Sequence, residues 1–203
     1  MGDRSKHWEK VYETMDPAEV SWFEAEPRVS LDLIQASGMP KSGAIIDIGA
    51  GASRLSGALV EQGYSDVSAL DLSEPALGAA AREMPKGTTV NWIVADARLW
   101  TPGREYDLWH DRAAFHFLTG PVDQEAYLDT LDRALRRGGH VIIGTFAIGG
   151  PEKCSGLPVQ QYDADGLATR LGPGYRLIRS VIWDHETPFG SLQRFHAGLL
   201  RKL

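Results

Sequence analysis

Glycines and acidic residues in the first half of the chain have the types and spacing of a site for a nucleotide-like ligand. Gly49 and Gly51 follow the apolar run 44–48, and glycine lets a backbone turn sharply and approach a ligand without a Cβ in the way. Asp47 precedes these glycines, and three further acids each follow an apolar segment: Asp71, Asp96 and Asp111. Carboxylates accept hydrogen bonds from hydroxyl, amine and ammonium groups, so the pattern favours a ligand that carries such donors.

The position of each acid suggests a role. Asp71 lies about 20 residues after the glycines, where an acid can accept hydrogen bonds from both hydroxyls of a ribose. Asp96 can accept from an exocyclic amine such as that of adenine, and Asp47 can order the glycine turn or attract a cationic group. Each acid alone is also a common turn or cap residue, but four in register favour a ligand site. Phosphate fits poorly, because no Gly-x-x-x-x-Gly-Lys motif is present.

The surrounding sequence predicts the strands that bring these acids together. Helical patterns alternate with five apolar segments at 44–48, 67–72, 90–95, 106–109 and 141–146. This alternation is typical of a mostly parallel, doubly wound α/β sheet. Since the carboxyl ends of its strands open on one edge, Asp71, Asp96 and Asp111 are expected to converge on the glycine turn. The segments 175–184 and 192–200 predict a C-terminal antiparallel hairpin, which makes a seven-stranded sheet.

Helices are predicted between the strands and at both flanks. The helical patterns cover 5–15, 27–37, 55–60, 73–83, 123–136 and 163–171. Trp22 and Phe23 lie in a connector, where they can form a lid over a site or pack against the sheet. We expect one domain over 1–203, with an N-terminal helical cap (1–40), a cofactor-binding core (41–146) and a substrate-side loop, helix and closing hairpin (147–203).

The composition narrows the class of protein. Hydrophobic residues at 43% and charged residues at 24% are ordinary for a soluble globular protein, and the net charge of −6 gives no reason to expect a nucleic-acid partner. Cys154 is the only cysteine, so the chain has no internal disulfide and no multi-cysteine zinc site. No secretory signal or membrane-spanning run is visible, which favours a cytoplasmic location. No metal requirement is visible in the sequence, and the sequence does not indicate the oligomeric state.

Together these motifs resemble the class I S-adenosylmethionine-dependent methyltransferases over about residues 40–147. The resemblance rests on Asp47-Ile48-Gly49-Ala50-Gly51 as the first motif, Asp71 as the ribose acid, Ala95-Asp96-Ala97 as the adenine-side motif, 106–111 as the fourth motif and 135–139 as the turn before the next strand. Ser53 replaces the usual third glycine. Segments 8–12, 20–23 and 153–159 narrow the resemblance to small bacterial relatives of the citrate synthase lysine methyltransferase group.

The resemblance implies a cofactor and a reaction. The cofactor is S-adenosyl-L-methionine, the product is S-adenosyl-L-homocysteine, and the methyl group passes by in-line displacement to a small molecule or a protein side chain. The cofactor-binding residues expected from the pattern and the resemblance are Asp47, Gly49, Ala50, Gly51, Asp71, Leu72, Asp96, Ala97, Asp111, Trp22 and Arg28.

Two residues after the fourth strand are the candidate catalytic groups. Asp111 can orient an amine, and His116 can act as a base at neutral pH, although packing between neighbouring aromatics explains His116 equally well. Arg112 can hold a carboxylate bidentately or pair with Asp111. Cys154 can contact a soft substrate, but a structural role is favoured because no nearby group activates its thiolate.

Two other functions stay open. A non-catalytic adenosyl-cofactor-binding or scaffold protein can keep the same fold and acids. An NAD(P)-dependent oxidoreductase is disfavoured, because the third glycine of the dinucleotide fingerprint is missing and the chain does not end in an α/β pattern. The expected partner is a methyl acceptor, with neither nucleic acid nor membrane, and the residues do not identify the acceptor or the atom methylated.

Overall fold

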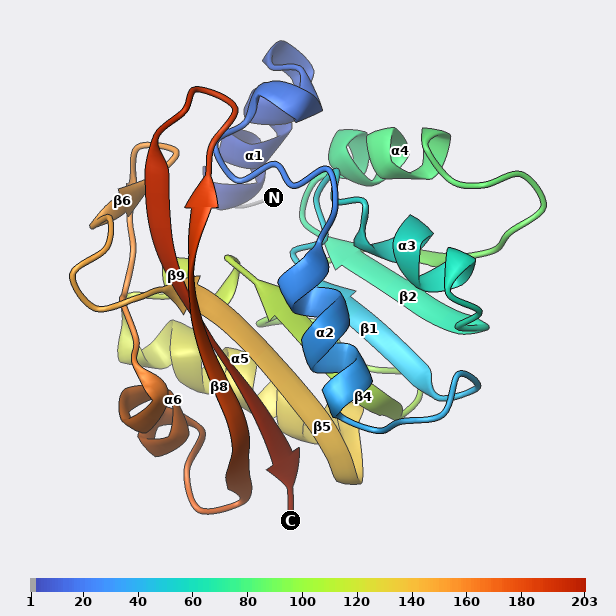
Figure 1. Ribbon diagram of the computed structural model, residues 1–203, viewed down its shortest axis with the longest axis vertical. Helices are drawn as coiled ribbons and strands as arrows, with labels where there is room; N and C mark the ends of the chain where they lie inside the picture. Colours follow the sequence, from blue (N-terminus) through green and yellow to red (C-terminus); the bar gives the residue numbers. More distant parts are fainter. Residues whose placement is uncertain (1–2) are drawn as a thin grey trace.

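The computed structural model describes residues 3–203, which form a mostly parallel sheet with helices on both faces (Figure 1). The sheet has seven strands in the order β3-β2-β1-β4-β5-β9-β8, and β9 runs antiparallel to both β5 and β8. The strands are β1 (Ala44–Ile48), β2 (Asp66–Asp71), β3 (Asn91–Val94), β4 (Tyr106–Arg112), β5 (Leu135–Phe146), β8 (Tyr175–Glu186) and β9 (Leu192–Lys202). The predicted fold class and closing hairpin are confirmed.

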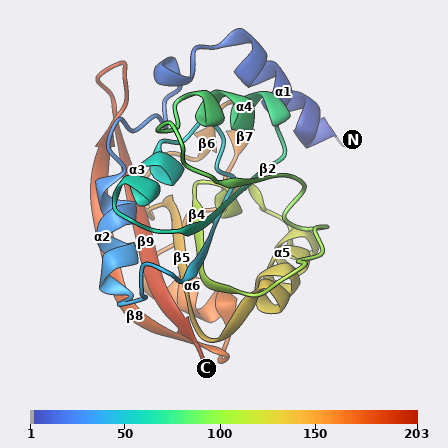
Figure 2. The same cartoon turned by 90° about the vertical axis from the view of Figure 1, so that its right-hand side faces the viewer.

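Helices cover both sheet faces because the central strands are apolar on both sides. In β1, Ile45 packs into the cluster under α2 and α3, and Ile46 packs into the cluster under α5 and α6. Figure 2 shows α2 and α3 on one side and α5 on the other. The helices are α1 (Asp3–Thr14), α2 (Arg28–Ala36), α3 (Leu55–Glu61), α4 (Glu74–Arg82), α5 (Pro121–Ala134) and α6 (Ala164–Leu171), with short 3₁₀ turns at Pro17–Glu19 and Phe115–Phe117. No helix within residues 3–203 combines the length and apolar character that crossing a bilayer requires.

The N-terminal helix lies across one edge of the sheet. Both views place α1 above the carboxyl ends of β1 and β2, next to α4 (Figures 1 and 2). This is the edge where strand order reverses between β1 and β4, and open α/β sheets bind ligands at such a point. Ser73 starts α4 there by accepting a hydrogen bond from the Ala76 amide at 3.3 Å, as its cap pattern predicts.

Several elements differ from the sequence prediction, among them the strand predicted at 141–146, which is β5 and begins at Leu135. β4 runs on to Arg112, so Asp111 lies inside the strand, opposite Ile48 and Ile143, and not beyond its end. The helix predicted at 123–136 begins at Pro121 and ends at Ala134, which leaves Arg136 in β5, 2.5 Å from Asp107. The loop 147–159 contains a short hairpin of β6 (Lys153–Cys154) and β7 (Leu157–Pro158), which the sequence did not predict.

A buried hydrogen-bond chain joins α5 to β4. The Trp109 indole donates to the Tyr127 hydroxyl at 2.8 Å, and that hydroxyl donates to Asp111 Oδ2 at 2.6 Å. The backbone amides of Ala114 and Phe115 also donate to Asp111. Burial raises the pKa of Asp111 to about 6, and these donors oppose the shift. All three side chains are therefore held by partners in the core.

Removal of the central hydroxyl is expected to destabilise the fold. Tyr127→Phe leaves the buried Trp109 N–H without an acceptor and removes a donor to Asp111, so the free energy of unfolding should fall by about 1–3 kcal/mol in urea titrations. Tyr106→Phe is the matched control, because its buried hydroxyl donates only to Ser68 at 3.3 Å, and it should lose about 1 kcal/mol or less. Equal losses in both variants would contradict the role given to the chain.

Candidate functional site

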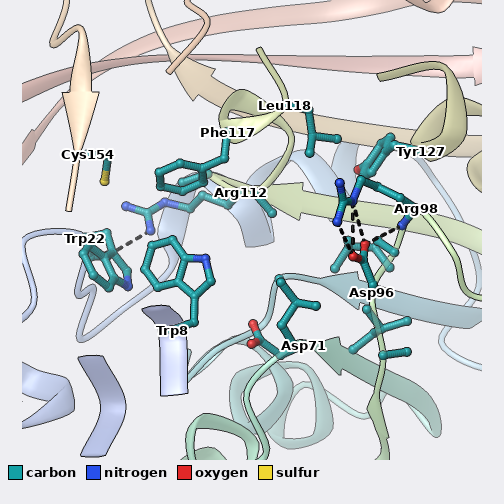
Figure 3. Close-up of a pocket in the computed structure, with 18 of the residues that line it drawn as sticks. Trp8, Trp22, Asp71, Asp96, Arg98, Arg112, Phe117, Leu118, Tyr127 and Cys154 are labelled. Carbon is teal, nitrogen blue, oxygen red and sulfur yellow. Dashed lines mark hydrogen bonds and ion pairs between the residues drawn. The ribbon is translucent and has the colours of Figure 1, made fainter. Parts of the chain in front are cut away.

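A cavity lies at the carboxyl edge of β1, β2 and β4, beneath α1 (Figure 3). The side chains drawn there form two groups at opposite ends. One end is lined by Asp96, Ala97, Arg98, Leu118 and Tyr127, and the other by Trp8, Trp22, Arg112, Phe117 and Cys154. Asp71 and Gly49 line the wall between them. The cavity therefore has an arginine at each end, Arg98 beside Asp96 and Arg112 among the aromatic residues, with Asp71 on the wall between them.

The glycine turn and Asp71 fix each other. Asp71 Oδ2 accepts a hydrogen bond from the Gly51 amide at 2.8 Å, and Oδ1 accepts one from the Ser73 amide at 2.8 Å. Burial raises the pKa of Asp71 to about 6. Gly49 and Gly51 have φ values of 64° and 54°, where a side chain would be strained. The sequence prediction that Asp71 meets the turn is confirmed.

Neither glycine of the turn has room for a side chain. A Cβ added at Gly49 would lie 2.4 Å from the Ala114 Cβ, and one added at Gly51 would lie 2.4 Å from the Tyr12 hydroxyl. Tyr12 thus inserts from α1 against the turn, and burial raises its pKa, with the charge of Asp71 adding to the shift. Sequence reasoning placed Tyr12 on one face of a helix but did not find its contact with the turn.

Arg98 holds the acid at the far end of the cavity. Its Nε donates to Asp96 Oδ1 at 2.9 Å, and its Nη1 donates to Asp123 Oδ1 at 2.5 Å. The hydrogen bond to Asp96 is the main reason that the pKa of Arg98 is raised. The sequence prediction named Asp96 and Ala97 here and missed Arg98, although its position two residues after Asp96 was a visible signal.

Asp47 lies below the turn and outside the cavity lining. Its Oδ1 is 2.6 Å from His110 Nδ1, and His110 Nε2 is 2.9 Å from the Ser30 hydroxyl. Asp47 and His110 are buried. This chain of contacts ties β1 and β4 to α2, so the Asp47 carboxylate is directed at a histidine from β4.

The structure does not bring three other predicted site residues to the cavity. Asp111 is fully buried and engaged with Tyr127 and backbone amides. His116 is fully buried between Phe117 and Phe146, with ring centroids 4.5 and 4.9 Å away, and burial lowers its pKa to about 3. Arg28 is exposed and pairs with Glu26 at 2.6 Å.

Aromatic residues from the N-terminal segment cover the other end. Trp8 meets Phe117 and Trp22 edge-on, with centroids 5.1 and 5.6 Å apart. Trp22 donates from its indole to the Tyr12 hydroxyl at 3.3 Å. Trp22 was predicted at the site, whereas Trp8 was predicted only as part of a helix face.

Comparison with known proteins identifies the central part of the chain. A family model described as "Methyltransferase domain" matches residues 45–139, which contain the glycine turn, Asp71 and Asp96. Residues 45–139 are thus similar to methyltransferase domains, as the resemblance to the class I S-adenosylmethionine-dependent enzymes implied. The predicted class and its cofactor are therefore confirmed, while the narrower resemblance to the citrate synthase lysine methyltransferase group stays a prediction.

One curated protein is similar in sequence to part of the chain. Trans-aconitate 2-methyltransferase of Azoarcus sp. (strain BH72) is 28% identical over 129 residues, which are 63% of this chain and 49% of that protein. The chain thus spans about half the length of this curated relative.

Two solved methyltransferase structures superpose on most of the chain. The N-methyltransferase NodS from Bradyrhizobium japonicum WM9, in complex with S-adenosylhomocysteine, is 16% identical with a TM-score of 0.71 and covers 99% of both chains. The Burkholderia thailandensis 1,6-didemethyltoxoflavin-N1-methyltransferase, with bound 1,6-didemethyltoxoflavin and S-adenosylhomocysteine, is 23% identical with a TM-score of 0.68, covering 87% of this chain and 77% of its own. At these identities the likeness shows the fold.

The contact between Tyr12 and the glycine turn can be tested with two glycine variants. Gly51→Ala should displace Tyr12 and α1, because the new Cβ would lie 2.4 Å from the Tyr12 hydroxyl. Gly63→Ala is the control, since its φ of 88° imposes similar backbone strain with nothing within 4 Å. Tryptophan fluorescence, which includes Trp8 and Trp22, should shift in Gly51→Ala alone. The same spectrum in both variants would contradict the contact.

Proposed function

We propose that the methyltransferase domain binds S-adenosylmethionine at the carboxyl edge of the sheet and transfers its methyl group to a small molecule. The observation that carries the proposal is the glycine turn closed by Asp71 beside a cavity, with the turn and Asp71 both inside the matched family region. When bound, the cofactor supplies an electrophilic methyl group on a sulfonium. The chain's own part is to bind, orient and shield the reactants, and positioning alone can contribute on the order of 7–11 kcal/mol.

The residues present fit such a cofactor. Gly49 and Gly51 give the turn its positive φ angles and let Ala114 and Tyr12 pack directly on it. Acids around a turn without phosphate-binding residues suit a ribose and an ammonium group. Asp71 would accept the ribose hydroxyls, Asp96 and Ala97 would lie beside adenine, and Leu72 lines the wall between. Trp22 would cover the methionine side. Ala50 sits in the turn, while Asp47 would support it through His110.

Several observations favour a small acceptor over a protein side chain. The names of two similar proteins specify small acceptors, trans-aconitate and 1,6-didemethyltoxoflavin. The cavity end beyond the glycine turn is covered by Trp8 and Trp22, and α1 is tied down by the contact of His7 Nε2 with the Ser155 hydroxyl at 3.2 Å. A covered cavity suits a compact molecule. A cytoplasmic location is part of the proposal, supported by the single buried thiol of Cys154.

Calorimetric titration with S-adenosylmethionine, S-adenosylhomocysteine and NAD tests the cofactor. Both adenosyl compounds should bind and NAD should not. Binding of NAD with neither adenosyl compound would overturn the proposal and favour the oxidoreductase alternative. Binding of both without methyl transfer to any cell fraction would favour the scaffold alternative.

The pH dependence of cofactor affinity tests the role of Asp71. Its pKa in the free protein is raised to about 6, and ribose hydroxyls donate to the ionised carboxylate, so protonation opposes binding. Affinity should be constant above pH 7 and fall as the pH drops through 6, approaching about tenfold per pH unit. Asp71→Asn should bind weakly with a flat profile between pH 5 and 7.5. An unchanged slope in Asp71→Asn would remove the ribose assignment.

A further inference from the structure

Arg112 is a cation on the wall of the aromatic end of the cavity. It is the last residue of β4 and lies at the end of the cavity opposite Asp96. Figure 3 shows its guanidinium beside Trp8, Trp22 and Phe117, near Cys154. Its side chain is 14% exposed, and the guanidinium lies over the Phe195 ring at 4.9 Å. A charge in such apolar surroundings is costly unless it is paired and hydrogen-bonded.

The partners of Arg112 within the chain leave it incompletely satisfied. Nη1 donates to the Trp22 carbonyl at 2.9 Å, and Nη2 lies 2.9 Å from Glu24 Oε1. Nη2 is therefore held in an ion pair, and Nε, which is shielded from solvent, makes no hydrogen bond within the described residues. Burial lowers the pKa of Arg112, and Glu24 opposes the shift. Arg98, the other arginine that lines the cavity, differs because it forms ion pairs with both Asp96 and Asp123.

The acid–base groups along the cavity are already engaged. Asp71 accepts from two backbone amides, and Asp96 accepts from Arg98. Tyr12 and Tyr127 have raised pKa values, mainly through burial, and burial raises the pKa of Cys154 to about 12. Among the described residues that line the cavity, these groups are poorly placed to take a proton from an acceptor. An acceptor that arrives already ionised needs no such base.

We propose that the acceptor is a small organic acid, that Arg112 attracts it by its carboxylate group, and that a carboxylate oxygen receives the methyl group. The inference rests on the proposed function and specifies its substrate class. The positive charge of the guanidinium attracts the carboxylate to this end of the cavity, and the aromatic rings receive the apolar part. In the transfer, an oxygen–carbon bond forms as the sulfur–carbon bond breaks, the bonding pair stays on sulfur, and no proton moves. The product is a methyl ester.

The test uses the lability of methyl esters in base. The full chain is incubated with S-adenosylmethionine tritiated in its methyl group and a small-molecule extract of source-organism cells. Residual cofactor is removed on a cation exchanger, and the product is treated with hydroxide. A methyl ester releases volatile labelled methanol, whereas a methyl group on nitrogen, sulfur or carbon stays in the non-volatile fraction. Most of the label is expected in the volatile fraction.

Variants of Arg112 and Glu24 connect the product to the guanidinium. Arg112→Met should lower ester formation by about 10- to 100-fold at limiting extract, the effect of losing a charged hydrogen-bond partner, and Arg112→Lys should recover part of it. Glu24→Gln is the matched control: it removes the internal partner and keeps the guanidinium, so ester formation should stay within about threefold of the original chain. All three variants should bind S-adenosylhomocysteine with nearly unchanged affinity.

Each outcome has one meaning. Loss of ester formation in Arg112→Met with retained S-adenosylhomocysteine binding supports the inference. Base-stable label overturns it and leaves methyl transfer standing. An equal loss of ester formation in Arg112→Met and Glu24→Gln overturns it, because Arg112 would then serve only as half of a structural ion pair. A parallel loss of S-adenosylhomocysteine binding in Arg112→Met also overturns it, because Arg112 would then bind the cofactor. No label in any fraction contradicts the proposed function itself.

Discussion

One carboxylate, that of Asp71, fixes the geometry of the carboxyl edge. It accepts from Gly51 in the turn after β1 and from Ser73 at the start of α4, so one side chain sets the position of two elements. Tyr12 packs on the same turn from α1, and its phenol feels the charge of Asp71. Displacement of Asp71 would therefore release the turn, the start of α4 and the seat of α1 together. The groups that hold the Asp71 carboxylate are the backbone amides of Gly51 and Ser73, so neither position needs a large side chain for this contact.

Burial of charge separates the structural ionisable groups from those directed at the cavity. Asp111 lies in the core with a hydroxyl and two backbone amides donating to it, and these contacts hold the Phe115–Phe117 turn against β4. Asp47 is likewise engaged by His110. Arg112 differs, because it lines the cavity although its side chain is largely buried. A buried charge is costly unless it is paired and hydrogen-bonded, and an anionic ligand in the cavity would add a second partner of opposite charge to Glu24.

Much of the fold and part of the site follow from the sequence. The positions of Asp71 and Asp96 at strand ends are predictable, because apolar runs mark the strands and parallel strands share one carboxyl edge. The burial of Asp111 is not, since it depends on how far β4 extends and on Tyr127 from a helix 16 residues away. The burial of His116 is equally hard to predict, because one of the rings that cover it, Phe146 of β5, is distant in sequence. The contact of Tyr12 with Gly51 also joins distant segments. Helix periodicity therefore predicts that Tyr12 lies on the buried face of its helix, but not that this face packs on the glycine turn.

The central claim is that this edge of the sheet holds the adenosyl cofactor through Asp71. A crystal structure of the chain with S-adenosylhomocysteine tests it most directly. We expect both ribose hydroxyls within hydrogen-bond distance of the Asp71 carboxylate, adenine beside Asp96 and Ala97, and the sulfur facing the Arg112 end of the cavity. A nucleoside bound elsewhere, or one whose ribose makes no contact with Asp71, would contradict it.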